Sequence, residues 1–498
     1  MLIQVMRRNL VNGFLLITLI MLFMAYIMAY ITVVPIYSQD SNKDWIIDKN
    51  TVIENVKKHV SENIIVKPNV TLVIANSIIY MDSEYNGELS IVVNKGSTLE
   101  IVNSTIRSGT NKTYLFNVYG TLIMRESTLR DCGIQHDKPG LVIEGSDYTV
   151  IKNSLIMGNY AGITIRRSEN IEITNNKIYA NVYGVSIANS RNIFISNNRF
   201  TANSYDLYSY NSTCITISNN YFEGGGLYID RSSNNMIINN EFKNTGVSLS
   251  GDKIVYYKHE FKNNIVNGKP LLYILNKSET ITGDIGMAII VSSKNVLIHN
   301  VSVYNTIVGI GLYFSNNIVI NSSIIKNNRI GIEIKFSRKI TLVNNKLEEN
   351  RMYGLKLYSS QDITAQYNNI VHNTLSGVLV MDSSNIHINY NNLTENDGYG
   401  IYVQDSNDIS AEYNWWGSIQ GPEYKEQSDS DEPEEIYSSN TNGFSYEPWL
   451  QKPVVGKNIE VYYRGWISNL LPYIVAMSVV IIILAIVRYY LRHMRSRK

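Results

Sequence analysis

The sequence is poor in cysteine, proline and charge. Cys132 and Cys214 are the two cysteines in 498 residues, which excludes a disulfide-rich scaffold. Only 17% of the residues are charged, and 44 basic side chains nearly balance 43 acidic ones to give a net charge of +1. Nucleic-acid-binding proteins usually carry a basic excess, so we predict no nucleic-acid partner. A hydrophobic content of 44% with nine prolines excludes disordered and collagen-like chains.

Histidine is also scarce, and its distribution argues against a metal site. The seven histidines are scattered along the chain, and many of the 14 methionines lie near the N-terminus or in apolar segments. His372 and His387 are about one repeat apart but occupy different positions of the repeat. Soft metal sites need clusters of His, Met and Cys. We therefore predict no metal and no cofactor.

Two long apolar segments flank the chain. Residues 9–38 carry no charge and follow Arg7 and Arg8, and the uncharged run 465–487 precedes a basic tail. Each run is long enough to cross a bilayer of ~30 Å, and the basic residues on the outer sides place both termini in the cytoplasm. The first run also fits a cleaved signal peptide, although it is longer than a usual signal core and lacks an A-x-A site. A cell-membrane protein with an extracellular middle is predicted.

The predicted organisation has five parts. Residues 1–38 are a membrane anchor or signal segment, 39–450 an extracellular domain, and 451–465 a juxtamembrane linker. Residues 466–488 form a transmembrane helix, and 489–498 a basic cytoplasmic tail.

A unit of 21–23 residues repeats through the middle of the chain. One copy starts at Asn170-Ile171-Glu172-Ile173 and the next at Asn192-Ile193. Each unit holds two alternating Ile-x-Ile pairs and one isolated apolar residue, which indicates three short strands per turn. A leucine-rich repeat has the same period but one strand per unit. The pattern therefore predicts an all-β fold, a parallel β-helix of about a dozen rungs over residues 45–420, stacked at ~4.8 Å.

The 61 asparagines and a column of glycines have structural roles in this scheme. Asparagine tolerates left-handed backbone angles at corners, and stacked amides can bond from rung to rung. Glycine suits a corner too tight for a Cβ. One predicted asparagine column contains Asn176, Asn198, Asn220, Asn240, Asn345, Asn369 and Asn392, and the other contains Asn181, Asn203, Asn328, Asn350, Asn373 and Asn396.

The period breaks in one place and ends at a set of aromatic residues. Residues 251–294 interrupt it, and Asn263 to Leu271 predicts a hairpin or loop beside the coil. The sequence Tyr413-Asn414-Trp415-Trp416-Gly417 follows the last regular rung. Because the open end of a solenoid must be covered, we expect these large aromatic residues to form a cap.

Four features of the chain resemble those of right-handed parallel β-helix surface proteins. They are the N-I-x-I-x-N-N-x-I rungs, the V-N-G-K-P insert, the N-W-W-G-x-x-x-G-P end and the Y-x-P-W-L tail. Within these proteins the chain is similar to the NosD-like branch, described as carbohydrate-binding and sugar-hydrolysis domains. The resemblance covers roughly residues 45–450 and implies a right-handed coil. Because that family spans lyases, hydrolases, adhesins and envelope proteins, fold does not give function.

The strand after the glycine column is the predicted ligand face. Side chains two and four residues after the glycine should point out of the coil and line up from rung to rung. An exposed ring could stack on a sugar, with charged groups beside it. The predicted sugar-binding residues are Tyr313, Glu333, Lys335, Lys356, Tyr358 and Tyr402. In the alternative, Glu333 pairs with Lys356 and the rings merely cover the sheet.

Catalysis is the competing hypothesis. Asp382 and Asp405 share a column in adjacent rungs, as the paired carboxylates of a glycosidase could, but aspartate is also a common turn former. No compact acid–base cluster is evident. We therefore expect a membrane-anchored surface protein that binds a glycan or has an envelope role. The alternatives are a membrane-tethered polysaccharide lyase or glycoside hydrolase, and a NosD-like accessory factor for a transporter or metalloenzyme.

Two kinds of residue bear on the outer surface. The cysteines are nearly four rungs apart, roughly 18 Å, so they cannot pair, and we expect both to be buried. Sequons for N-glycosylation start at Asn69, Asn103, Asn111, Asn211, Asn276, Asn300, Asn321 and Asn392.

Overall fold

A computed structural model describes residues 44–424 and 435–455. By backbone contacts the chain divides into two units, Met1–Trp45 and Ile46–Lys498, and nearly all of the described strands belong to the second unit. Both predicted membrane segments and the cytoplasmic tail lie outside the described residues. Among the described residues, no helix combines the length and apolar character needed to span a bilayer.

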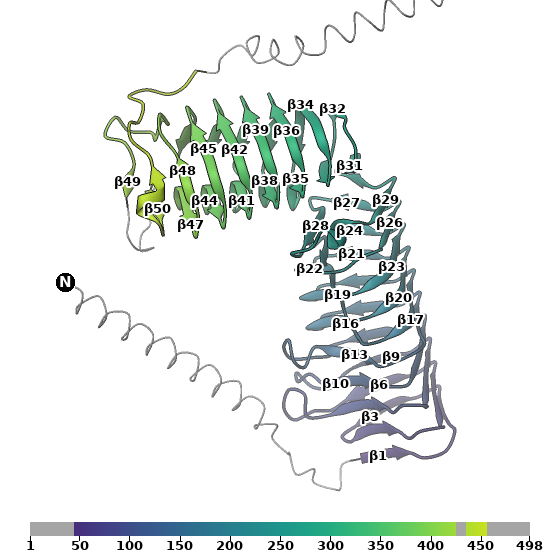
Figure 1. Ribbon diagram of the computed structural model, residues 1–498. Coiled ribbons are helices and arrows are strands. Elements are labelled where there is room, and N and C mark those ends of the chain that lie inside the picture. Colours follow the sequence, from purple (N-terminus) through teal and green to yellow (C-terminus); the bar gives the residue numbers. More distant parts are fainter. Residues whose placement is uncertain (1–43, 425–434, 456–498) are drawn as a thin grey trace, which may run out of the picture. The chain divides into compact units, whose positions relative to one another are not determined.

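The first stack of rungs consists of three parallel sheets (Figure 1). Sheet 1 contains β1 (Asp44–Ile47), β4 (Asn63–Val66), β7 (Ser90–Val93), β10 (Leu115–Val118), β13 (Gly140–Glu144), β16 (Ala161–Arg166), β19 (Tyr183–Ala188), β22 (Tyr205–Tyr210), β25 (Leu227–Asp230) and β28 (Val247–Ser250). Sheet 2 contains β2 (Thr51–Glu54), β5 (Thr71–Ala75), β8 (Thr98–Val102), β11 (Thr121–Arg125), β14 (Thr149–Lys152), β17 (Glu169–Thr174), β20 (Arg191–Ser196), β23 (Thr213–Ser218), β26 (Met236–Ile238) and β29 (Glu260–Lys262). Sheet 3 contains β3 (Lys57–Val60), β6 (Ile78–Met81), β9 (Thr105–Ser108), β12 (Thr128–Arg130), β15 (Leu155–Met157), β18 (Lys177–Tyr179), β21 (Arg199–Thr201), β24 (Tyr221–Glu223), β27 (Glu241–Lys243) and β30 (Ile265–Val266).

The second stack continues the coil with two sheets. Sheet 4 contains β31 (Lys269–Leu275), β33 (Met287–Val291), β35 (Val308–Tyr313), β38 (Ile330–Lys335), β41 (Tyr353–Tyr358), β44 (Ser376–Met381), β47 (Tyr399–Gln404), β50 (Glu435–Ser438) and β49 (Glu423–Tyr424). Sheet 5 contains β32 (Thr280–Asp284), β34 (Lys294–Tyr304), β36 (Asn316–Asn321), β37 (Ile324–Lys326), β39 (Arg338–Val343), β40 (Lys346–Glu348), β42 (Gln361–Gln366), β43 (Asn369–Val371), β45 (Ser384–Asn389), β46 (Asn392–Thr394), β48 (Asn407–Ser410) and β51 (Phe444–Ser445). The solenoid has about 17 turns, more than the predicted dozen, and its last strands lie beyond residue 420.

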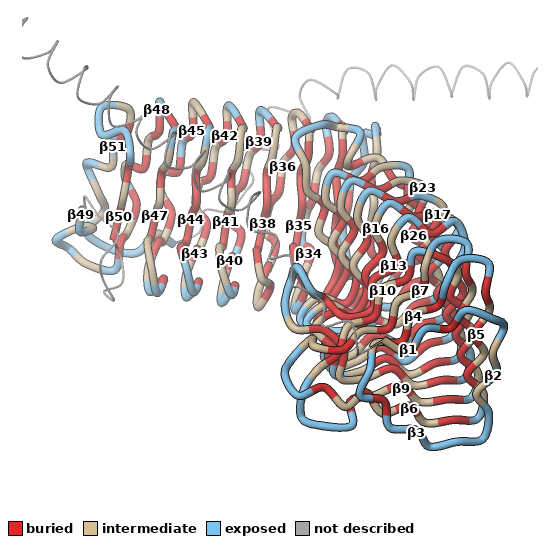
Figure 2. Tube along the Cα trace, turned by 90° about the horizontal axis from the view of Figure 1, so that it is seen from below, coloured by how far each residue is buried: buried red, intermediate tan, exposed pale blue. Residues whose placement is uncertain are grey.

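Alternation along each strand builds the core. Ile171, Ile193 and Ile215 pair across β17, β20 and β23 and are fully buried. Buried positions repeat along the inside of the coil, whereas the exposed positions gather at the corners between strands (Figure 2). Because equivalent residues stack in register, each rung buries its apolar side chains against the rungs before and after it.

The break in the period falls where the sequence predicts it, but it divides the predicted single coil into two stacks. The 3-10 helix η1 (Ile254–Tyr257) follows β28, and η2 (Thr441–Gly443) lies near the C-terminal end. The predicted hairpin is confirmed: β30 and β31 pair antiparallel, with Ile265 opposite Pro270 and Val266 opposite Lys269. The second stack then begins from β31.

The asparagine columns are buried amide ladders. Asn198 Oδ1 accepts both the backbone N–H of Asn176 (2.9 Å) and its Nδ2 (3.0 Å), while Asn176 Nδ2 also donates to the carbonyl of Ile151 (2.9 Å). The left-handed backbone is one residue earlier, at Asn175 (φ 58°). The second predicted column forms two ladders of the same kind, one through Asn181 and Asn203 in the first stack and one through Asn328, Asn350, Asn373 and Asn396 in the second stack. The left-handed corner and the amide ladder therefore belong to two adjacent asparagines, whereas the sequence predicted both roles for a single one.

The prediction of the first asparagine column is wrong by one residue near the C-terminal end of that column. After Asn345 the ladder continues through Asn368 and Asn391, whose Oδ1 atoms each accept the preceding ladder N–H at 2.9 Å. Asn369 and Asn392 instead begin β43 and β46. The rungs lengthen here by one residue, so the two neighbouring asparagines are easily exchanged when counting from the sequence.

The glycine column has the predicted steric cause. A Cβ on Gly309 would lie 2.6 Å from the carbonyl oxygen of Gly331, and one on Gly331 would lie 2.5 Å from that of Gly354. The expected aromatic cap is also present: Trp416 is fully buried in the core of the second stack, and Trp449 packs against the same cluster.

Candidate functional site

Two of the predicted sugar-binding residues are buried, so the prediction of one continuous exposed face is wrong at the first two of its six residues. Tyr313 is 1% exposed and Glu333 is 2% exposed. The ring of Tyr313 lies over Gly311, where a Cβ would be 2.5 Å from its hydroxyl. Tyr257 of η1 then packs on Tyr313 with ring centroids 4.6 Å apart. The insert after β28 thus covers this part of sheet 4.

Glu333 is the centre of a buried ionic cluster. Its Oε1 lies 2.9 Å from Lys335 Nζ and 3.2 Å from Lys356 Nζ, and its Oε2 accepts a hydrogen bond from the Tyr313 hydroxyl at 3.0 Å. Burial raises the pKa of Glu333, but the two ammonium groups and the hydrogen bonds outweigh it and leave the pKa below its usual value. The cross-rung pair between Glu333 and Lys356, which was the structural alternative to a sugar-binding face, is confirmed.

The other two predicted residues lie farther along sheet 4. Tyr358 is half-buried and meets Phe336 edge to face, with ring centroids 5.6 Å apart. Tyr402 stacks on Tyr437 of β50 at 4.6 Å. The register places the apolar side chain of Leu379 between Lys356 and Tyr402. The six residues therefore do not form one uninterrupted polar face.

Asp382 and Asp405 lie at exposed corners. Both have left-handed backbone angles (φ 48°), one residue before Ser383 and Ser406. Ser406 Oγ accepts the backbone N–H of Ser383 at 3.0 Å, so the serines form the ladder and the aspartates make the turns. This geometry is that of turn-forming aspartates.

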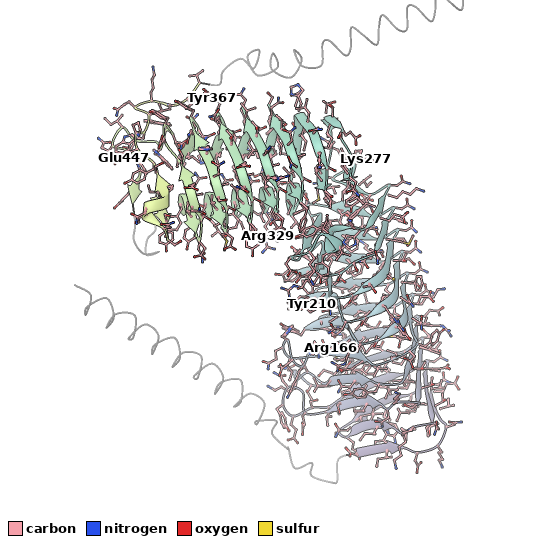
Figure 3. All side chains as sticks on the ribbon, in the orientation of Figure 1. Arg166, Tyr210, Lys277, Arg329, Tyr367 and Glu447 are labelled. Carbon is pink, nitrogen blue, oxygen red and sulfur yellow. The ribbon has the colours of Figure 1, made fainter. Side chains whose placement is uncertain are left out.

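A pocket of about 310 Å³ brings residues of both stacks together. Its lining residues include Tyr205, Tyr208, Tyr228, Asp230, Arg329, Glu333, Lys335 and Lys356. We call it the junction pocket. Figure 3 labels Arg329, which precedes β38, and Tyr210, which ends β22 of sheet 1. Lys335, Lys356 and Glu333 thus line a pocket together with residues of sheet 1, whereas Tyr313, Tyr358 and Tyr402 are not among its lining residues.

Hydrogen bonds order the polar groups in the junction pocket. Arg329 Nη1 donates to the Tyr228 hydroxyl at 3.2 Å, across 101 residues of sequence. The Tyr208 hydroxyl donates to Asp230 Oδ2 at 3.2 Å. Burial, followed by the charge of Asp230, raises the pKa of Tyr208 to about 12, so this phenol stays protonated. Tyr208, Tyr228, Asp230 and Arg329 are not among the predicted site residues, and Arg329 lies in a corner without a distinctive motif.

A buried carboxyl lies beneath the tyrosines of β22. Asp206 is fully buried where neighbouring rungs have glycine. Its Oδ1 accepts from Asn203 Nδ2 at 2.9 Å, and its Oδ2 accepts from the Gly226 N–H at 2.7 Å. Burial raises the pKa of Asp206 to about 7 despite these hydrogen bonds.

The sequons and cysteines differ in accessibility. Asn321 is buried and bonded to His299, and Asn392 is half-buried and bonded to Val454, so these two amides are occupied within the fold. The other sequon asparagines are exposed: Asn69, Asn103, Asn111, Asn211, Asn276 and Asn300. Both cysteines are free thiols, but Cys214 is exposed, which corrects the expectation that both are buried. In the part of the chain that the structure describes, no group of three or more His, Cys, Asp or Glu side chains is arranged to hold a metal.

Comparison with known proteins establishes the family. The model of the right handed beta helix region matches residues 35–220, 123–284 and 286–419, so the chain belongs to this family of right-handed β-helix proteins. No curated protein matches the chain.

The chain is also similar to solved structures at low identity. The periplasmic alginate epimerase AlgG is 14% identical, with 79% of this chain and 78% of that chain covered and a TM-score of 0.22. DFA-IIIase from Arthrobacter chlorophenolicus A6 is 11% identical, with 63% and 74% covered and a TM-score of 0.33.

Proposed function

We propose that the protein is a cell-surface β-helix that binds a saccharide in the junction pocket. The observation that carries the proposal is the convergence of tyrosine rings and charged side chains from two stacks on one cavity of about 310 Å³. Small-molecule sites are concave and combine apolar walls with a few placed polar groups. The extracellular location rests on the two apolar segments of the sequence.

The chemistry of the lining suits a sugar. Tyr205 and Tyr228 meet edge to face at 5.0 Å, which leaves differently oriented aromatic surfaces for the C–H face of a pyranose. Asp230 and Arg329 can bond hydroxyl and carboxylate groups. Three basic side chains against two carboxylates give the lining a positive balance, and Glu333 already neutralises part of it. This balance favours a glycan that carries carboxylates.

The test is a glycan-array screen of the purified full-length protein, followed by calorimetric titration with uronic-acid oligosaccharides. Arg329→Gln should weaken binding about tenfold, because it removes a charged donor from the pocket. Arg351→Gln is the matched control, since Arg351 occupies the equivalent corner of the next rung and is exposed. Absence of binding to any glycan, or equal losses in both variants, would contradict the proposal.

A second candidate is a polysaccharide-processing enzyme acting in the same pocket. The observation that favours it is the presence of two carboxylates, Asp230 and Glu333, with Tyr208 and two lysines around one cavity. Glycosidases use paired carboxylates, and elimination needs a basic group. Release of reducing or unsaturated ends that disappears in Asp230→Asn but persists in Asp382→Ala and Asp405→Ala would support catalysis. Binding of the polysaccharide without release of a product would support the binding function and contradict catalysis.

A further inference from the structure

A second cavity lies on the first stack, next to the junction pocket. It has a volume of about 150 Å³, and its lining includes His136, Tyr160, Thr164, Arg166, Tyr183 and Tyr208. We call it the Thr164 cavity. Figure 3 labels Arg166, which ends β16. Tyr208 lines both cavities, so they adjoin at this one ring.

Thr164 has a buried hydroxyl without a partner. Its side chain is 3% exposed, and its Oγ1 has no hydrogen bond to any described residue. Burying an unsatisfied hydroxyl costs free energy, so native proteins rarely retain one without a reason. A ligand in the cavity would supply the missing hydrogen bond.

The charge of the Thr164 cavity has one sign. Arg166 is its one permanently charged lining residue, and the lining includes no carboxylate. Arg166 Nη2 lies 3.5 Å from the backbone carbonyl of His136, a weak contact for a guanidinium with five N–H donors. Guanidinium groups bind carboxylates with paired hydrogen bonds. The cavity is therefore suited to an anionic group beside an aromatic wall.

The register makes the two cavities collinear along the stack. Thr164, Ser186, Tyr208 and Tyr228 pair successively across β16, β19, β22 and β25. Each step is ~4.8 Å, similar to the length of one pyranose unit in a linear chain. The rings of Tyr208 and Tyr183, both of which line the Thr164 cavity, meet edge to face with their planes 67° apart.

We propose that the Thr164 cavity is a second subsite that binds a uronic-acid unit of the same glycan, with Arg166 pairing its carboxylate and Thr164 bonding it. This inference rests on the proposed function of the junction pocket and names its ligand: a linear acidic polysaccharide that extends over both cavities. Affinity should therefore rise with chain length until both subsites are filled.

The experiment is calorimetric titration of the full-length protein with uronic-acid disaccharides and tetrasaccharides, and with a neutral tetrasaccharide. The wild type should bind the acidic tetrasaccharide at least tenfold more tightly than the disaccharide. Thr164→Val and Arg166→Gln should each remove most of this tenfold gain. Thr164→Ser, which keeps the hydroxyl, and Arg125→Gln, an exposed arginine of sheet 2, should retain it.

Thermal unfolding distinguishes a ligand contact from a structural one. Thr164→Val should not lower the melting temperature, because it removes a polar group that has no partner in the fold. If wild type binds acidic oligosaccharides but the variants keep the full length dependence, the second subsite is overturned and the junction pocket stands. If the wild type binds no acidic oligosaccharide, both the second subsite and the proposed ligand class are overturned. A variant that unfolds shows that Thr164 is structural and also overturns the subsite.

Discussion

The hydroxyl of Tyr313 donates a hydrogen bond to the buried carboxylate of Glu333 at 3.0 Å. Burial raises the pKa of Tyr313 well above its ordinary value, so the phenol stays protonated and remains a hydrogen-bond donor. The same carboxylate holds Lys335 and Lys356 at the edge of the junction pocket. The ionic cluster thus links the core of sheet 4 to the charged groups available to a ligand.

Glu333→Gln should destabilise the protein by about 3 kcal/mol at pH 7, because it leaves two largely buried ammonium groups without their carboxylate. Since the folded pKa of Glu333 is lowered, its stabilisation is complete above the ordinary value of 4.5 and is lost as the pH falls through the folded value. Urea unfolding between pH 3 and pH 7 measures this. A variant with the same acid dependence as wild type would contradict the assignment.

Asp206 should make stability depend on pH in the opposite direction. Its folded pKa of about 7 lies above the unfolded value of 3.8, so the folded state binds more protons between these values and stability falls as the pH rises through them. Relative to Asp206→Asn, wild type should lose about 3 kcal/mol between pH 4 and pH 7 and little more above pH 8. Melting temperatures of both proteins across this range provide the check. Parallel curves would exclude a buried titrating carboxyl at this position.

The division of roles between adjacent asparagines can be tested at Asn219 and Asn220. Asn220 is buried and bonds Asn198, Asn240 and the carbonyl of Ile195, so Asn220→Ala should cost about 3 kcal/mol by leaving several groups unsatisfied. Asn219 is exposed with φ 55°, so Asn219→Gly should change stability by less than about 1 kcal/mol. Urea unfolding compares them. Equal costs would contradict the assignment of the stabilising hydrogen bonds to Asn220 alone.

The two thiols should differ in reactivity. Cys214 is exposed, whereas Cys132 is buried and its pKa is raised by burial and by Asp131. A maleimide should label one thiol per native chain and two after denaturation, as counted by mass spectrometry. Cys214→Ser should abolish native labelling. Two labels on the native protein would mean that the rung around Cys132 opens readily.

The repeat made the coil predictable from the sequence. Each rung contacts mainly its neighbours, so the period, the inward isoleucines, the glycine column and the aromatic cap can all be recognised from local spacing. The same locality explains the error at Asn369 and Asn392: a left-handed corner and a ladder amide lie next to each other in sequence, and both favour asparagine. The sequence also specified the hairpin after Asn263, because its break in the period is local.

The site depended on contacts that no local pattern records. Tyr257, which comes from the insert, packs on Tyr313, and Tyr313 in turn bonds the buried Glu333. Arg329 and Tyr228 meet although 101 residues separate them, because the insert ends one stack and starts another. Strand alternation by itself determined which side chains leave the coil. Only the tertiary structure decided which of them are covered and which share a pocket, since that depends on where distant rungs come into contact.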